Sequence, residues 1–225
     1  SVLVRYTGTG AITAGTALTV GSTTYTFVDA IAANTIAVEV TGFAATIADF
    51  VTLSGNIGFK KSGTDIVAVG TGISASMTAG GSVSVSLSNA SFGLKAGSGS
   101  TAFELKNGSF AASITGLGSI TATSVLVRYT GATAIAANTA LTVGSTSYTF
   151  VDGIAANTIA LEVTGFNASI ANFVSLSGNL GFKKTGTEII AVGTGVSASL
   201  TAGGAVSVSL TNASFGLQAS STSTA

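Results

Sequence analysis

The chain repeats itself after 123 residues, and this feature constrains its fold more than any other. The stretch SVLVRYTG at Ser1 recurs at Ser124, and residues 1–102 align without a gap with residues 124–225. The two stretches are identical at 80 of 102 positions. The sequence therefore predicts a first full unit, 1–123, and a second, incomplete unit, 124–225, which together look like an excerpt from a longer tandem array.

A shorter period lies inside the long one. Seven segments in the first unit begin with alternating apolar residues, which is typical of strands with two different faces. They are VLV (2–4), LTV (18–20), VEV (38–40), VTL (51–53), VAV (67–69), VSL (85–87) and FEL (103–105). Their average spacing is between 17 and 18 residues, and the SGN, SNA and KNG stretches among them are predicted to be turns.

Short strands at this spacing predict an all-β fold, a parallel β-solenoid with coils of about 17–18 residues. In this interpretation VSLSNASFGL (85–94) is one rung, with Val85, Leu87, Phe92 and Leu94 pointing inward. The absence of proline fits, because nearly every backbone N–H would bond to the next coil. The alternative is a tandem of β-sandwich domains. The segment 12–37 is the least regular and is predicted to be an excursion, with an irregular coil or a short helix at 29–34.

Composition excludes several kinds of chemistry. The chain has no Cys and no His, which excludes thiol nucleophiles, Ser-His-Asp triads and soft-metal sites. Eight basic and eight acidic residues give zero net charge, which argues against nucleic-acid binding. The uncharged stretch 66–94 is rich in Ser, Gly and Thr, which argues against membrane insertion. We expect no catalytic, cofactor or metal site.

The few charged residues can be considered one by one. Lys60 and Lys61, with Lys183 and Lys184, are predicted to lie in solvated turns, the alternative being a basic ladder for an acidic polymer. Glu39 and Glu104 take the middle positions of VEV and FEL, so we expect them to point outward, too far apart for glycoside hydrolysis. Arg5 and Arg128 each precede a tyrosine and are predicted to stack on tyrosine rings or to pair with an acid.

Two further sets of residues suggest sites and have plainer explanations. Asp29, Asp49 and Asp65 resemble calcium ligands, but the repeated calcium-binding nonapeptide is missing and Asp49 becomes Asn172, so we expect turn capping. Four asparagines lie in Asn-x-Ser, the acceptor sequence for glycans: Asn89, Asn107, Asn167 and Asn212. We expect them to supply the left-handed conformation of tight turns.

The run VTLSGNIGFKKSGTDIVAVGTGISASMTAGGSVSVSLSNASFGL resembles the Ser/Thr/Gly/Ala-rich tandem β-repeats of very large secreted bacterial surface or adhesin-type proteins. The resemblance implies an extracellular or cell-surface location, a structural or adhesive role, such as in a biofilm matrix, and no functional residues. We therefore predict a structural, non-enzymatic repeat module of a fibre, filament or giant surface protein, whose partners are copies of itself. The alternative is a surface that binds carbohydrate or ice through outward hydroxyls, those of Thr52, Ser74, Ser76, Ser84 and Ser86.

Overall fold

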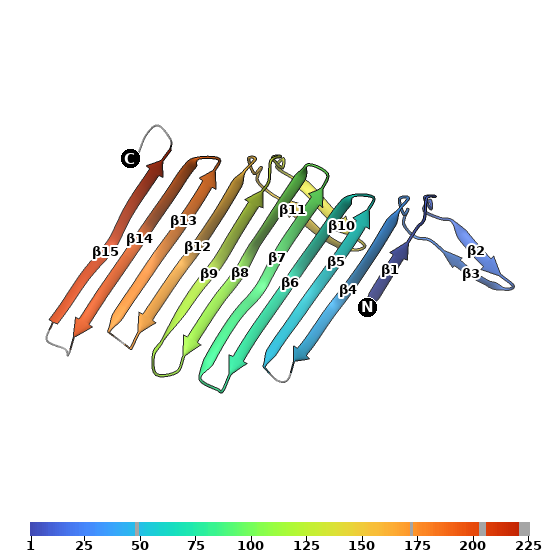
Figure 1. Cartoon of the computed structure of the whole chain (residues 1–225). Coiled ribbons are helices and arrows are strands. Elements are labelled where there is room, and N and C mark those ends of the chain that lie inside the picture. The colour runs from blue at the N-terminus through green and yellow to red at the C-terminus, as the bar shows by residue number, and fades with distance from the viewer. Residues whose placement is uncertain (48–49, 172, 203–205, 221–225) are drawn as a thin grey trace.

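The computed structural model describes residues 1–47, 50–171, 173–202 and 206–220, and within these ranges it contains strands and no helix. The strands are β1 (Val2–Tyr6), β2 (Ala17–Val20), β3 (Thr23–Thr26), β4 (Thr35–Ile47), β5 (Val51–Ser62), β6 (Asp65–Ala79), β7 (Val83–Gly97), β8 (Ser100–Ile114), β9 (Gly118–Thr130), β10 (Thr139–Val143), β11 (Thr146–Phe150), β12 (Thr158–Ile170), β13 (Val174–Thr185), β14 (Glu188–Ala202) and β15 (Val206–Ala219). Eleven of them form one sheet in the order β1-β4-β5-β6-β7-β8-β9-β12-β13-β14-β15 (Figure 1). The other four form two hairpins, β2 with β3 and β10 with β11.

The prediction of an all-β chain is confirmed, but the predicted parallel β-solenoid is wrong. All neighbouring strands of the sheet run antiparallel. Parallel neighbours need a crossover of about a dozen residues or more, whereas β5 ends at Ser62 and β6 begins at Asp65. The spacing of 17–18 residues thus reflects one long strand and a tight turn. The alternative of separate sandwich domains does not hold either, because strands of both units lie in one sheet.

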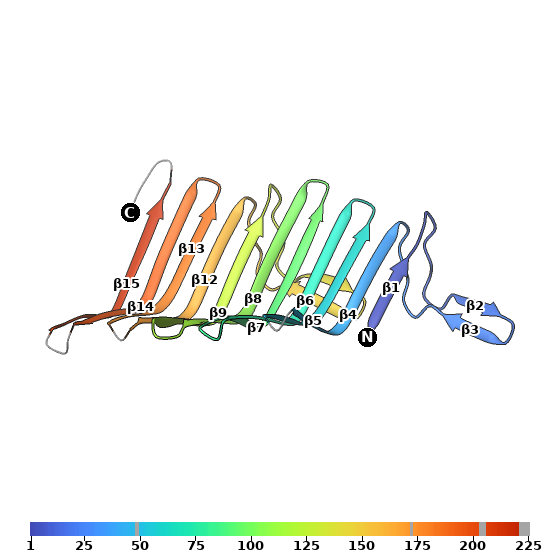
Figure 2. The same cartoon turned by 60° about the horizontal axis from the view of Figure 1, so that its bottom comes forward.

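The SGN, SNA and KNG stretches lie inside strands, and they bend the strands instead of ending them. Gly55 in β5, Gly72 in β6, Asn89 in β7 and Asn107 in β8 all have positive φ angles, and the pairing shifts register beside most of them. Neighbouring strands bend at neighbouring positions, so the whole sheet bends along one row (Figure 2). We call the half that contains residues 56–62 of β5 the hairpin limb, and the half that contains residues 51–54 the serine limb.

The predicted rung VSLSNASFGL is therefore the middle of β7, with its bend at Asn89. Val85 and Leu87 lie in the serine limb, whereas Phe92 and Leu94 lie in the hairpin limb. All four side chains are only partly buried. The prediction that they point into a closed interior is wrong, because an open single sheet encloses no interior.

Strand β9 crosses the boundary between the two units. It runs from Gly118 to Thr130, so residues 118–123 belong to the first unit and residues 124–130 to the second. It pairs with β8 on one side and with β12 on the other. The predicted division after residue 123 consequently falls within a strand, and the two units share one continuous sheet.

The β10–β11 hairpin covers one face of the hairpin limb, over β4 to β7 (Figure 1). Along the hairpin, buried residues alternate with exposed ones, as expected for strands with one covered face. Its buried residues pack with residues of the sheet and of the adjoining loops into one hydrophobic core. The members of this core are Ala37, Val69, Ala102, Ile135, Leu141, Val143, Tyr148, Phe150 and Ile154.

The predicted excursion at 12–37 is found for residues 12–34, which form a hairpin outside the sheet, whereas residues 35–37 belong to β4. Its strands β2 and β3 pair antiparallel, and Ile12 forms a bridge to Ile31 at the base. The short helix predicted at 29–34 is absent, because Ile31 in the middle of this stretch is extended and forms the β-bridge to Ile12. The equivalent bridge in the second unit joins Ile135 to Ile154.

Candidate functional site

The tip of the β10–β11 hairpin binds the carboxylate of Glu39 on β4. The backbone N–H of Ser145 donates to both carboxylate oxygens, at 2.9 and 3.1 Å. The hydroxyls of Ser145 and Thr146 donate to Oε1 at 2.7 and 2.8 Å. The prediction that Glu39 points outward is wrong: its side of the strand is covered by a hairpin more than 100 residues later, and it is only 5% exposed.

The hydrogen bonds keep Glu39 ionised. Burial raises the pKa of Glu39, because the charged form loses water. The donors from Ser145 and Thr146 outweigh burial and bring its pKa below the ordinary value of 4.5. Its negative charge is thus balanced by N–H and O–H dipoles at the hairpin tip, and no basic side chain is needed there.

Glu104 on β8 is fully buried beneath the same hairpin, so the prediction that it points outward is also wrong. The hydroxyl of Tyr148 donates to Oε1 at 2.6 Å, and Nε of Arg128 donates to Oε2 at 2.5 Å. Lys106 lies 3.7 Å from Oε1, and a second nitrogen of Arg128 donates to Asp152 at 2.7 Å. A buried carboxylate is tolerated only when it is paired in this way.

Two of these partners have shifted pKa values. Burial and the hydrogen bond to Glu104 raise the pKa of Tyr148, which therefore stays a neutral donor. Burial lowers the pKa of Arg128, but its hydrogen bonds to Asp152 and Glu104 outweigh burial and raise it. The prediction that the arginines pair with acids is confirmed for Arg128 and for Arg5, which pairs with Asp29.

Two glycines allow the hairpin to approach the sheet. A Cβ added at Gly58 would lie 2.7 Å from Cβ of Val143, and one added at Gly93 would lie 2.3 Å from Cδ1 of Tyr148. Real Cβ atoms do not come so close, and a larger residue at either position would push the hairpin away. We call the surface under the hairpin, which contains Ala37, Glu39, Gly58, Val67, Val69 and Gly93, the covered face.

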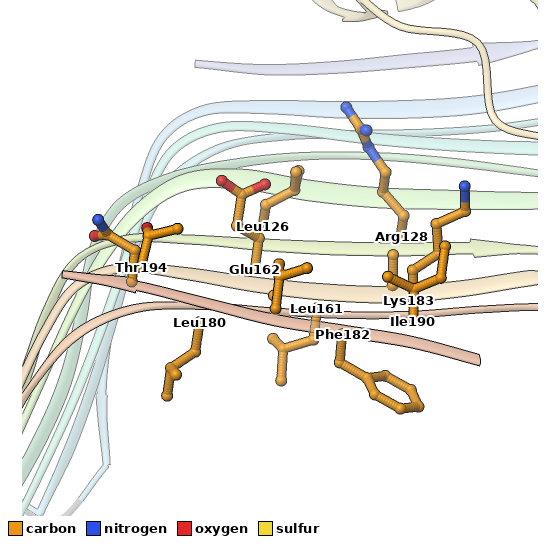
Figure 3. A pocket seen from close by; sticks show the side chains of 13 residues that line it. Leu126, Arg128, Leu161, Glu162, Leu180, Phe182, Lys183, Ile190 and Thr194 are labelled. Atoms are coloured by element: carbon orange, nitrogen blue, oxygen red, sulfur yellow. The ribbon is translucent and has the colours of Figure 1, made fainter. Parts of the chain in front are cut away.

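The second unit presents the same surface, and no hairpin of the described residues covers it. We call the equivalent residues Ala160, Glu162, Gly181, Ile190, Val192 and Gly216 the open face; most of them line an open depression of about 410 Å³. Glu162 and Arg128 point to one side of the sheet there, whereas Leu161 and Phe182 point to the other (Figure 3). Val69 is 0% exposed, and its equivalent Val192 is 44% exposed.

The hairpin of the first unit, β2–β3, likewise packs on no part of the sheet that the structure describes. It extends beyond β1 at the edge of the sheet (Figures 1 and 2), and all eight of its strand residues are exposed. Residues 17–29 and 140–152 nevertheless differ at one position only, Thr24 and Ser147. Val20 is 83% exposed in the first hairpin, whereas Val143 is 2% exposed in the second.

The hydroxyls considered for ligand binding lie on the serine limb. Thr52, Ser76 and Ser86 face one another in register across β5, β6 and β7. The Oγ atoms of Thr52 and Ser76 are 2.6 Å apart, and those of Ser84 and Ser113 are 2.8 Å apart. Ser74 accepts from the backbone N–H of Asn89. These side chains form a hydroxyl row on one side of the serine limb.

The predicted basic and calcium residues are scattered. Lys60 and Lys61 lie at the end of β5 and Lys183 and Lys184 at the end of β13, inside strands and not in the turns that follow. Asp65 begins β6, Asp29 pairs with Arg5, and Asp49 lies outside the described residues. The described ranges contain no group of three acidic, His or Cys residues that could hold a metal ion.

The left-handed conformation predicted for the asparagines is found at Asn89, Asn107 and Asn212, with φ angles of 56°, 63° and 51°. It occurs at bends inside strands and not in tight turns between them. Asn167 differs: it lies within β12, paired with Ser177 and Thr121, and has no positive φ. The glycan-acceptor interpretation stays untested.

Sequence reasoning missed the hairpin that forms the covered face. The signal was present in ALTVGSTTYTF (17–27), where two alternating segments are separated by Gly-Ser, a pattern typical of a two-residue hairpin turn. Nothing in the local sequence indicates that the hairpin covers Glu39 or that Tyr148 reaches Glu104, because these contacts span 106 and 44 residues.

In the part of the chain that the structure describes, there is no helix of the length and hydrophobicity needed to cross a membrane. Comparison with known proteins finds no match: no protein family, no curated protein and no solved structure is similar to this chain.

Proposed function

We propose that this chain is a structural repeat module of an extracellular fibre, filament or giant cell-surface protein, in which successive 123-residue units extend one sheet. The observation that carries the proposal is that β9 crosses the unit boundary and bonds to a strand of each unit. A junction of this kind can be repeated at every boundary, since each unit offers the next one an open strand edge.

The surface of the molecule supports a role in assembly. Its accessible surface is 12592 Å², whereas a compact monomer of this mass is expected to expose roughly 9,200 Å². The excess fits a single-layer sheet, which leaves many apolar side chains exposed. Among these are Phe59, Tyr129, Leu161 and Phe182. Zero net charge leaves little electrostatic repulsion between copies.

The contacts of two acidic residues also support a structural role. Glu39 and Glu104 are both held by hydrogen bonds at the contact between hairpin and sheet, which supports a structural function. The extracellular location is proposed from the resemblance of the sequence to the repeats of large secreted surface proteins.

The test of this proposal is the shape of a longer chain. Each unit adds six strands to the sheet, equivalent to β4 through β9, and at about 4.8 Å per strand this lengthens the molecule by about 29 Å. A chain with one further 123-residue unit should grow by that length across the strands and keep its other dimensions, as seen by electron microscopy or small-angle scattering. Separate beads, or growth in every dimension, would overturn the proposal.

The hydroxyl row of the serine limb favours a second candidate, a surface that binds carbohydrate or ice. Thr52, Ser76 and Ser86 repeat from strand to strand at the spacing of a sheet, about 4.8 Å. A thermal-hysteresis assay and a glycan-binding screen test this candidate. Replacing Ser76 and Ser86 with alanine should abolish a true signal, and wild-type chain without any signal rules the candidate out.

A further inference from the structure

We infer that the open face is a docking site for the β2–β3 hairpin of a second copy of this chain. Two copies would then join head to tail, and Ser22 and Thr23 of one copy would donate hydrogen bonds to the carboxylate of Glu162 of the other. This inference deepens the proposed function, on which it rests: continuous strands would join units along the chain, and the hairpin would join them through space.

The chain itself contains the template for this contact. The β10–β11 hairpin and the covered face form it once, and the two equivalent surfaces, the β2–β3 hairpin and the open face, are both exposed. Glu162 is the equivalent of Glu39, and within the described residues its carboxylate has no hydrogen-bond or ion-pair partner. Ser22 and Thr23 are the equivalents of Ser145 and Thr146, and their side chains are exposed. The donors of one copy thus match the acceptor of the other.

The apolar parts of the contact also match. Val20 and Tyr25 are 83% and 60% exposed, whereas the same side chains in the second hairpin, Val143 and Tyr148, are almost fully buried. The surface that would receive them keeps its glycines, Gly181 and Gly216. A Cβ at Gly93 would strike Tyr148, but a Cβ at Gly216 would meet no atom within 4 Å. The open face therefore has space where a tyrosine ring would lie.

The symmetry of such a contact decides what it builds. The hairpin lies at one end of the chain and the open face at the other, so the interface joins two different surfaces and leaves one of each free (Figure 1). Head-to-tail interfaces that do not close generate open linear assemblies. Glu104 and Lys106 have no equivalents among residues 124–225, so the contact between chains is expected to be weaker than the internal one.

Cysteine cross-linking tests the inference directly, because the chain has no native cysteine. Chains carrying V20C are mixed with size-tagged chains carrying G181C and oxidised mildly at high protein concentration. The equivalent atoms of the internal pair, the Cβ positions at Val143 and Gly58, are 2.7 Å apart, so a small shift brings them to the 3.5–4.5 Å of a disulfide. A chain with V143C and G58C is the positive control, and T19C, which lies on the other side of the hairpin, replaces V20C as the negative control.

The expected result is a mixed covalent dimer from V20C with G181C, and its loss with T19C. A second variant, G216V, should leave the unfolding midpoint unchanged. It should abolish both the cross-link and the concentration-dependent association that we expect sedimentation of the wild-type chain to show. Failure of V20C and G181C to cross-link, while the internal control pair does so, would overturn the inference. The shape of the longer chain is measured separately and tests only the continuous sheet. A failed cross-link would therefore contradict the hairpin contact without contradicting the proposed function.

Discussion

Glu39 and Glu162 occupy the same position of the two units and have opposite surroundings, which makes a matched pair of variants. E39Q places an amide N–H₂ against the donors of Ser145 and Thr146, and should lower the free energy of unfolding by about 1–3 kcal/mol. E162Q changes an exposed side chain and should have almost no effect on a dilute, unassociated chain. Denaturant unfolding of both variants measures the difference, and equal losses would contradict the role of Glu39.

The same residue predicts how stability depends on pH. The pKa of Glu39 is lower in the folded chain than its ordinary value of 4.5, so its ionised form favours the docked hairpin. That contribution is complete above the ordinary value and is lost as the pH falls through the lower, folded-state pKa. The difference in unfolding midpoint between wild type and E39Q should therefore shrink on acidification. A difference that stays constant down to about pH 3 would show that the charge contributes nothing.

Single residues were predictable where their chemistry is local. Asparagine adopts the left-handed conformation at low cost, and this is seen at Asn89, Asn107 and Asn212. Asn167 does not adopt this conformation. The equivalent residue of the first unit is Ala44, so this position of the strand does not require an asparagine. The directions of Glu39 and Glu104 were not predictable, since strand alternation gives two faces and does not say which face another part of the chain will cover.

At the scale of elements, the two hairpins provide a test within one molecule. Their sequences are almost identical, so differences in amide protection must come from their surroundings. The amides of β10–β11 lie over the core and should exchange slowly, near the rate set by global unfolding. Those of β2–β3 are expected to exchange fast, because an isolated two-stranded hairpin is marginally stable. Hydrogen exchange by mass spectrometry measures both, and equal protection in dilute solution would contradict the packing described.

Strands were predictable from alternation, but their lengths and partners were not. A left-handed residue inside VSLSNASFGL looks the same in sequence whether it ends one strand or bends a longer one. Because of this ambiguity, the sequence of the 15-residue strand β7 was interpreted as two short strands joined by a turn, which favoured a β-solenoid coil. The tight turn between Ser62 and Asp65 contained the opposing signal, because only antiparallel strands can be joined by two residues.

At the scale of the whole molecule, the 123-residue repeat is plain in the sequence, but the architecture that it builds was predicted only in part. Repetition indicated that neighbouring units stack, which the shared strand β9 shows in another form. The candidate site could not be derived from one unit, because it lies between them: a hairpin from residues 139–150 covers strands from residues 35–97. The hydrogen bonds of this contact join residues 44 to 107 positions apart, so they leave no local pattern in the sequence.

The direction in which the sheet grows decides how an array of these units would respond to tension. A force along the array acts at right angles to the strands and therefore parallel to the hydrogen bonds between them. These hydrogen bonds would break one after another, whereas in shear they would all bear the load together. Each strand with its turn would release roughly 60 Å of chain, and one unit about 29 Å long would release roughly 400 Å. An array of this kind would be soft and extensible, because it would lengthen in small steps under a sudden load before any covalent bond is strained.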